Sequence, residues 1–389
     1  MAFLQIDTVC RRFYRREMHH SGPSGTASPA NSERTPVRAA VFLRNIGVFL
    51  AVCTLACVGL RAALPFPRIN TIGTKYRYFA KHRDDYDVLF IGSSRFYHQI
   101  IPPQFDAAVS AAGGRKIRSF NISCDALWPP ESCYYLEKVL ALRPKNLRWV
   151  FMELMDINPR IGEPGMTSDR DAYWHDLPRT RMAWAALAAT PVSTQFTEER
   201  KRQLAVEHGW QLAEQWVNFG RGAQLLTLPL ASRKSWDDRS GGSDHAGDWL
   251  PTAGYKPEGE KPISGEELSH LLTNTKRLLD TGLDPAPPSP ILHEAMRHAG
   301  GQILAAKAQP IFAITPTTNS HENITSLPEG WPIFAFNDPQ TYPQLFEPAA
   351  HFDEFHLNHS GAVEFTDLLA QRFSEYLKQQ PAATPAAGP

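Results

Sequence analysis

Three kinds of polar side chain at opposite ends of the sequence could together carry out nucleophilic chemistry. Ser93 and Ser94 follow the apolar run from Val88 to Ile91, and Asp353 stands three residues before His356. A serine hydroxyl has too high a pKa to attack a carbonyl unaided, so it needs a base within hydrogen-bond reach and a third group that fixes the tautomer of that base. One of the two serines, with His356 as base and Asp353 to orient it, would supply these roles. The pattern predicts acyl transfer.

These residues can meet only if secondary structure brings them to one edge of a sheet. Apolar strand-like runs alternate with helical patterns after residue 86, which predicts an α/β fold with a doubly wound, mostly parallel sheet. Strands are expected at 88–91, 116–123, 147–155, 310–316 and 331–338. Helices are expected at 102–114, 129–144, 289–309 (interrupted at Gly300 and Gly301) and 360–379. Because ligands of such sheets bind outside the carboxyl ends of the strands, segments 92–95, 121–125 and 351–361 are the candidate site.

The regular alternation is lost between Arg160 and Pro288. Segments 171–189 and 198–219 have helical patterns, whereas 235–262 reads as a long exposed loop. We therefore predict an α/β domain over 84–380 that carries an insertion at 160–288, which caps the sheet. Residues 77–86 are expected to form a short polar connector, and 381–389 a disordered low-complexity tail.

The longest apolar stretch runs from Asn45 to Phe66 and predicts a transmembrane helix or signal anchor. Residues 1–44 form a polar leader with seven arginines, which we expect to be disordered and to stay in the cytoplasm. This predicts a single-pass protein of the cell membrane whose C-terminal domain lies outside the cytoplasm. A cleaved signal peptide is less favoured because the leader is long. A helix buried in a cytoplasmic, soluble hydrolase is the remaining alternative.

Composition excludes several other classes of protein. Lys and Arg (40) balance Asp and Glu (40), which argues against nucleic acid as a partner. Five cysteines are too few for a disulfide scaffold, and the chain has no CxxC or HExxH motif. The sequence therefore predicts neither a metal site nor an organic cofactor.

The three strand-end segments resemble the motifs of the SGNH/GDSL hydrolase superfamily. The motifs are Gly92-Ser93-Ser94, then Asn121, and lastly Asp353-x-x-His356 followed by Leu-Asn-x-x-Gly. The likeness is closer to the membrane-anchored branch of that superfamily, which includes the D-alanyl transfer protein of teichoic acid modification and polysaccharide acyl-modifying proteins. It covers residues 86–160 and 310–377 and implies a flavodoxin-like fold.

By this resemblance, Ser94 is the nucleophile, Ser93 replaces the family's aspartate, and Asp353 and His356 complete the triad. The family's oxyanion hole uses a glycine N–H from the second motif, where this chain has Asp125 or Ala126, and an asparagine from the third, where Asn158 is a weak candidate.

Two further residues of these segments have open roles. Asn121 either closes a turn or binds substrate. Arg95 either grips an anionic substrate or, as we favour, pairs with an acid.

The resemblance implies a membrane-anchored serine esterase or O-acyltransferase that acts on an acylated carbohydrate or lipid of the cell envelope. Hydrolase and transferase share the same triad, so the motifs do not separate them. Because the family's glycines are missing from the second and third motifs, a catalytically inactive binding or assembly protein of the cell envelope is the alternative.

Overall fold

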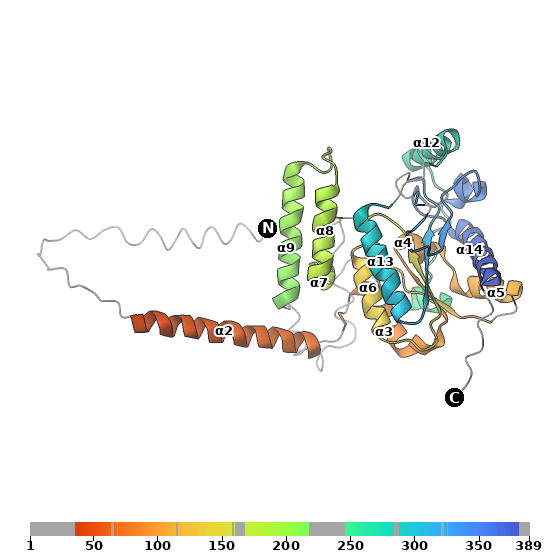
Figure 1. Ribbon diagram of the computed structural model, residues 1–389. Coiled ribbons are helices and arrows are strands. Elements are labelled where there is room, and N and C mark those ends of the chain that lie inside the picture. Colours follow the sequence, from red (N-terminus) through yellow and green to blue (C-terminus); the bar gives the residue numbers. More distant parts are fainter. Residues whose placement is uncertain are drawn as a thin grey trace, which may run out of the picture. The chain divides into compact units, whose positions relative to one another are not determined.

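The computed structural model (Figure 1) describes residues 36–63, 66–67, 69–113, 116–157, 159, 168–217, 246–283, 288–319, 323–324 and 326–380. Internal contacts divide the chain into two units, residues 1–55 and 56–389. Asn158 and the C-terminal segment 381–389 lie outside the described residues, and so does most of the leader.

The second unit is built on a sheet of five parallel strands in the order β2-β1-β3-β4-β5. This confirms an α/β protein with a parallel sheet. The order 2-1-3-4-5 is one of the two common orders of doubly wound sheets. The strands are shorter than predicted: β1 Val88–Ile91, β2 Ser119–Asn121, β3 Trp149–Glu153, β4 Gln309–Ile314 and β5 Ile333–Ala335.

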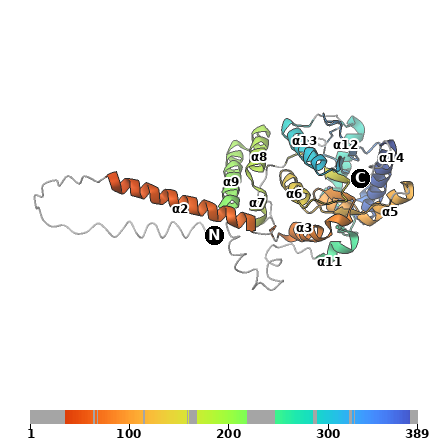
Figure 2. The ribbon, with the colours of Figure 1, turned by 60° about the horizontal axis from the view of Figure 1, so that its bottom comes forward.

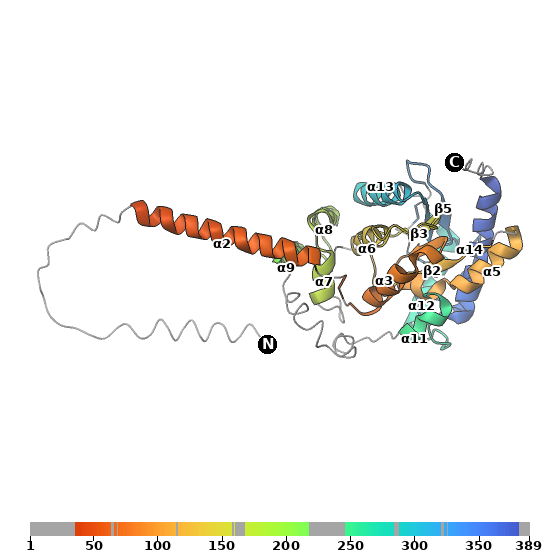
Figure 3. The same cartoon turned by 90° about the horizontal axis from the view of Figure 1, so that it is seen from below.

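Helices cover both faces of the sheet. Each strand directs alternate apolar side chains to opposite faces, so each face needs its own layer of helices to form a core. Leu89 and Ile91 of β1 join one core, and Val88 and Phe90 join the other. Figures 1 and 3 show the helices of the two faces on opposite sides of the sheet. The first face carries α3 Asn70–His82, α6 Glu131–Leu140 and α13 Pro290–Ala305; the second carries α4 Ser94–Gln99, α5 Pro102–Gly113 and α14 His359–Gln379. Short 3-10 helices lie at η1 Arg83–Asp85, η4 Pro343–Phe346 and η5 Pro348–Ala350.

Two local predictions on the first face are wrong. The polar connector predicted at 77–86 is largely helix α3, which buries Ile72 and Phe79 in the core. The break predicted at Gly300 and Gly301 does not occur, since α13 is continuous across both. A Cβ on Gly300 would lie 2.3 Å from the ring of Trp331, so the glycine is there to let that ring pack on the helix.

Helix α2, Pro36–Ala63, is the apolar helix of the chain. Its segment Ala39–Ala62 is long and apolar enough to cross a bilayer, by length and composition alone. The helix begins nine residues before the predicted start at Asn45, so the leader predicted as disordered to residue 44 ends in helix. The predicted end at Phe66 lies beyond the last helical residue, Ala63.

The insertion contains six helical segments within the described residues. They are α7 Ser168–Trp174, α8 Leu177–Ala189, α9 Glu198–Val217, α11 Ala246–Trp249, η2 Leu250–Thr252 and α12 Gly265–Thr281. The single helix predicted at 171–189 is two helices, because the Asp176 side chain accepts from the N–H of Arg179 and caps a new helix. Helices α7 and α8 pack against α6 and α13, on one face of the sheet.

The prediction of an exposed loop at 235–262 is also wrong in part. Trp249 and Tyr255 are buried, each with 1% of its surface exposed, and α11 packs beside α3 (Figures 2 and 3). The backbone of this segment runs along the free edge of β2, where the N–H of Asn121 donates to the carbonyl of Ala253 at 2.9 Å. Gly254 follows with φ of +103°, and a Cβ there would lie 2.0 Å from the Asn121 carbonyl oxygen.

Two buried histidines make the insertion sensitive to acid. Nε2 of His208 lies 3.0 Å from the Pro159 carbonyl, and its Nδ1 lies 2.8 Å from Nε2 of His175, whose Nδ1 faces the carbonyl of Asp171. Burial lowers the pKa of His175 to about 3 and that of His208 to about 4. Both groups are therefore neutral in the folded state but charged in the unfolded chain below pH of about 6.5. Their stabilisation is complete above that pH and is lost as the pH falls towards 4.

We expect the thermal midpoint to fall between pH 7 and pH 5, at a cost on the order of 2 kcal/mol per histidine. Thermal unfolding followed across this range by circular dichroism measures the effect. The variant His208→Gln should flatten the dependence, whereas His270→Gln, at an exposed position on α12, should leave it unchanged. Equal slopes for wild type and His208→Gln would contradict this account.

Candidate active site

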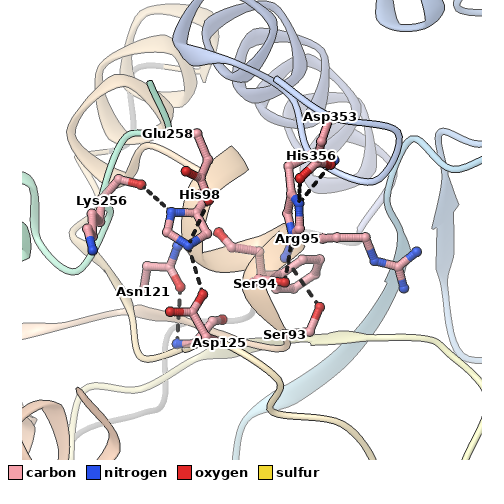
Figure 4. Close-up of polar contacts among 12 residues, drawn as sticks. Ser93, Ser94, Arg95, His98, Asn121, Asp125, Lys256, Glu258, Asp353 and His356 are labelled. Atoms are coloured by element: carbon pink, nitrogen blue, oxygen red, sulfur yellow. Dashed lines mark hydrogen bonds and ion pairs between the residues drawn. The ribbon is translucent and has the colours of Figure 1, made fainter. Parts of the chain in front are cut away.

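The structure brings Ser94, His356 and Asp353 into one hydrogen-bonded chain (Figure 4). Nε2 of His356 lies 2.8 Å from the Ser94 Oγ, and its Nδ1 lies 2.8 Å from Oδ2 of Asp353. Because a carboxylate only accepts, it fixes the proton on Nδ1 and leaves Nε2 to accept from the Ser94 hydroxyl. Ser94 is the first residue of α4, directly after the carboxyl end of β1, and the other two precede α14.

The loop that carries His356 and Asp353 is shaped by Asp353 itself. Its Oδ1 accepts from the N–H groups of Phe355 (2.7 Å) and His356 (2.8 Å) as well as facing the imidazole. Burial raises the pKa of the Asp353 carboxyl, but the hydrogen bonds and the charge of His356, together with these N–H groups, outweigh it and lower the pKa overall. Asp353 is therefore ionised at neutral pH, as an orienting group must be.

The turn before Ser94 is held by Glu153, at the end of β3. Its carboxylate, 1% exposed, accepts from the backbone N–H of Ser93 at 2.5 Å and from Nε of Arg95 at 2.8 Å. A Cβ on Gly92 would lie 2.6 Å from the same carboxylate, so only glycine fits there. Arg95 thus pairs with an acid, which is the favoured alternative, and Ser93 caps α4 by accepting from the Arg95 N–H at 3.3 Å.

Asn121, at the end of β2, links two loops. Its Nδ2 donates to the carbonyls of Phe96 (2.7 Å) and Ile100 (3.1 Å), and its Oδ1 accepts from the Ser123 N–H (3.1 Å). The side chain is fully buried. Within the described residues, the hydrogen bonds of this side chain all go to the protein's own backbone.

A second histidine–aspartate pair, His98 with Asp125, lies beside the pair of His356 and Asp353. The sequence analysis did not predict this second pair. His98 is one turn after Ser94 on α4, and its ring centroid is 6.1 Å from that of His356. Its Nε2 lies 2.8 Å from Oδ1 of Asp125, and its Nδ1 faces the carbonyl of Lys256 at 2.7 Å. Burial lowers the pKa of His98, but Asp125 and nearby Glu258 raise it above its usual value.

The Asp125 carboxylate is therefore hydrogen-bonded to a side chain of α4. The residue that follows it has an unusual backbone conformation. Ala126 has φ of +53°, in the left-handed region that glycine favours. Asn158, the weak third candidate, lies outside the described residues.

Lys75 of α3, which sequence analysis also missed, supports the same loop from within the core. Its Nζ donates to the carbonyls of Asn121 (3.0 Å), Ser123 (2.6 Å) and Gly254 (2.6 Å). It also lies 3.7 Å from the centre of the Tyr97 ring. This fully buried ammonium joins the end of β2 to the segment that covers the edge of that strand.

No cluster of three or more metal-ligating side chains occurs among the residues that the structure describes. No protein-family model matches the chain, and no curated protein matches it. The arrangement of the described residues is therefore the basis for assigning chemistry.

Proposed function

We propose that this chain is a serine esterase or O-acyltransferase of the SGNH/GDSL type, anchored in a membrane by α2. The observation that carries the proposal is the continuous hydrogen-bonded chain from Ser94 through His356 to Asp353. Its members come from the two ends of the sheet domain, at the carboxyl edge where ligands of such sheets bind. The strand order agrees with the flavodoxin-like fold of that superfamily.

The reaction would proceed through an acyl-enzyme. The Ser94 Oγ attacks the carbonyl carbon of the ester while Nε2 of His356 takes the hydroxyl proton. The imidazolium, stabilised by Asp353, then gives this proton to the leaving alkoxide oxygen as the ester C–O bond breaks. In the second half, His356 takes a proton from water or from a sugar hydroxyl, whose oxygen attacks the acyl carbon. The Ser94 oxygen leaves and regains its proton from His356.

The substrate class follows from the resemblance and from α2. We propose an acylated carbohydrate or lipid of the cell envelope, with the α/β domain outside the cytoplasm. No metal or organic cofactor takes part in these steps.

The test is release of p-nitrophenolate from p-nitrophenyl acetate by the purified full chain in detergent. A burst of acylation reports the first half-reaction whether the enzyme is a hydrolase or a transferase. Ser94→Ala should abolish release above the uncatalysed rate. Ser93→Ala removes the α4 cap, worth about 1 kcal/mol, and should keep most of the release. An equal loss of p-nitrophenolate release in both variants, or release that survives Ser94→Ala, would contradict the assignment of Ser94 as the nucleophile.

The second candidate is a catalytically inactive binding or assembly protein of the same fold. The observation that favours it is that the polar side chains of Asn121 and Asp125 bond to the protein itself. Folded wild type that releases no p-nitrophenolate and forms no covalent adduct would support this candidate.

A further inference from the structure

On one side, the loop after β2 is hydrogen-bonded to the turn that precedes the nucleophile. The N–H of Cys124 donates to the carbonyl of Gly92 at 3.4 Å, which joins this loop to the turn before Ser94. The carboxylate of Asp125 reaches His98, one turn after Ser94 on the same helix (Figure 4). The peptide that joins Asp125 to Ala126 is therefore next to the element that carries the nucleophile.

A side chain from the insertion holds this peptide on the other side. Nη2 of Arg170, on α7, donates to the carbonyl of Asp125 at 2.8 Å. In a trans peptide the N–H points opposite to the carbonyl. The Arg170 contact therefore directs the N–H of Ala126 away from α7. Within the described part of the chain this N–H makes no hydrogen bond.

The peptide needs such a support because its conformation is strained. A residue with a Cβ in the left-handed region costs about 1–2 kcal/mol, and Ala126 has φ of +53°. Arg170 is itself fixed by Glu131, the first residue of α6, at 2.9 Å from Nε to Oε1 and 3.0 Å from Nη2 to Oε2. Both side chains are largely buried.

We propose that Arg170 is a positioning residue of the active site: it holds the Asp125–Ala126 peptide so that the Ala126 N–H donates to the oxyanion formed when Ser94 attacks. His98 holds the same peptide through the Asp125 carboxylate. The insertion thereby completes the oxyanion hole through one arginine. This inference rests on the proposed acyl-transfer function.

Arg179 provides a matched control. It too is a buried arginine of the insertion that reaches α6, where Nη2 donates to Oε2 of Glu137 (2.6 Å) and to the carbonyl of Cys133 (3.3 Å). Its remaining hydrogen bonds within the described residues go to Asp176, so Arg179→Met breaks a comparable link without touching the oxyanion loop.

The experiment measures the acylation burst with p-nitrophenyl acetate for wild type, Arg170→Met and Arg179→Met, together with thermal midpoints. Loss of one oxyanion donor typically lowers the rate by about 100-fold or more. For Arg170→Met we expect a fall of this size in the acylation rate constant at saturation. The half-saturation concentration should stay within about threefold of wild type, because the donor acts on the transition state and not on substrate binding. Arg179→Met should change the rate less than threefold while lowering the midpoint similarly.

One further variant, a conservative one at the same position, separates a loss of folding from a loss of rate. Arg170→Lys retains the charge but not the forked donor and should fold even where Arg170→Met does not; we expect a rate about tenfold below wild type. Equal rate losses for the Arg170 and Arg179 variants, or a loss confined to the half-saturation concentration, would overturn the inference while leaving the proposed function intact. A folded wild type without any burst would overturn both together.

Discussion

Replacing His356 by alanine is expected to lower the acylation rate of Ser94 by about 10⁴- to 10⁶-fold. Without the imidazole, the Ser94 hydroxyl loses the base that it contacts in the described part of the chain, and the neutral hydroxyl is a poor nucleophile. Asp353→Asn should cost about 10⁴-fold, because an amide in place of the carboxylate no longer selects the His356 tautomer with its proton on Nδ1. The burst of p-nitrophenolate release measures both rates.

The two effects should not add. Once His356 is absent, Asp353 has no base to orient, so the double variant should match His356→Ala within about threefold. The control is His293→Gln, on α13, where the histidine faces Glu329. Retention of more than a tenth of wild-type activity by His356→Ala would show that a different base acts on Ser94.

Replacing Lys75 by methionine is expected to destabilise the folded domain by about 3–6 kcal/mol, because each buried carbonyl left without a donor costs about 1–3 kcal/mol. The ammonium of Lys75 donates to three such carbonyls, two at the end of β2 and one at Gly254. Methionine has a similar volume, so a cavity contributes little to the expected loss. Equilibrium unfolding in urea, followed by circular dichroism, gives the free energy of unfolding.

Lys81→Met supplies the control for this loss. Lys81 lies on the same helix, α3, but is exposed, so the same substitution should change stability by no more than about 0.5 kcal/mol. Similar stabilities for Lys75→Met and Lys81→Met would mean that the three carbonyls find other donors and that the buried ammonium does not hold the loop.

The strands and the Ser94–His356–Asp353 chain were predictable because local signals encode them. Val88–Ile91 is a continuous apolar run that ends in Gly-Ser-Ser, and Asp353 and His356 stand close enough in sequence to meet in one turn. Parallel topology then places both segments at one edge of the sheet.

The supports of the site were not predictable, because each joins segments distant in sequence. Glu153 is a single acid at the end of an apolar strand, and nothing local indicates that it accepts from Ser93 and Arg95. The signal that could have found His98 is its spacing of four residues from Ser94, which places both on one face of a helix. Lys75 was missed because the segment around it was not recognised as a helix with a buried side.

The most direct test of the account is the mapping of a fluorophosphonate adduct on the full wild-type chain by peptide mass spectrometry. One adduct is expected, on the hydroxyl of Ser94, and it should be absent after heat unfolding and in His356→Ala. A folded wild-type protein that gains no adduct, or one that carries it on Ser93 or at another position, would contradict the claim that these three side chains form a working nucleophile.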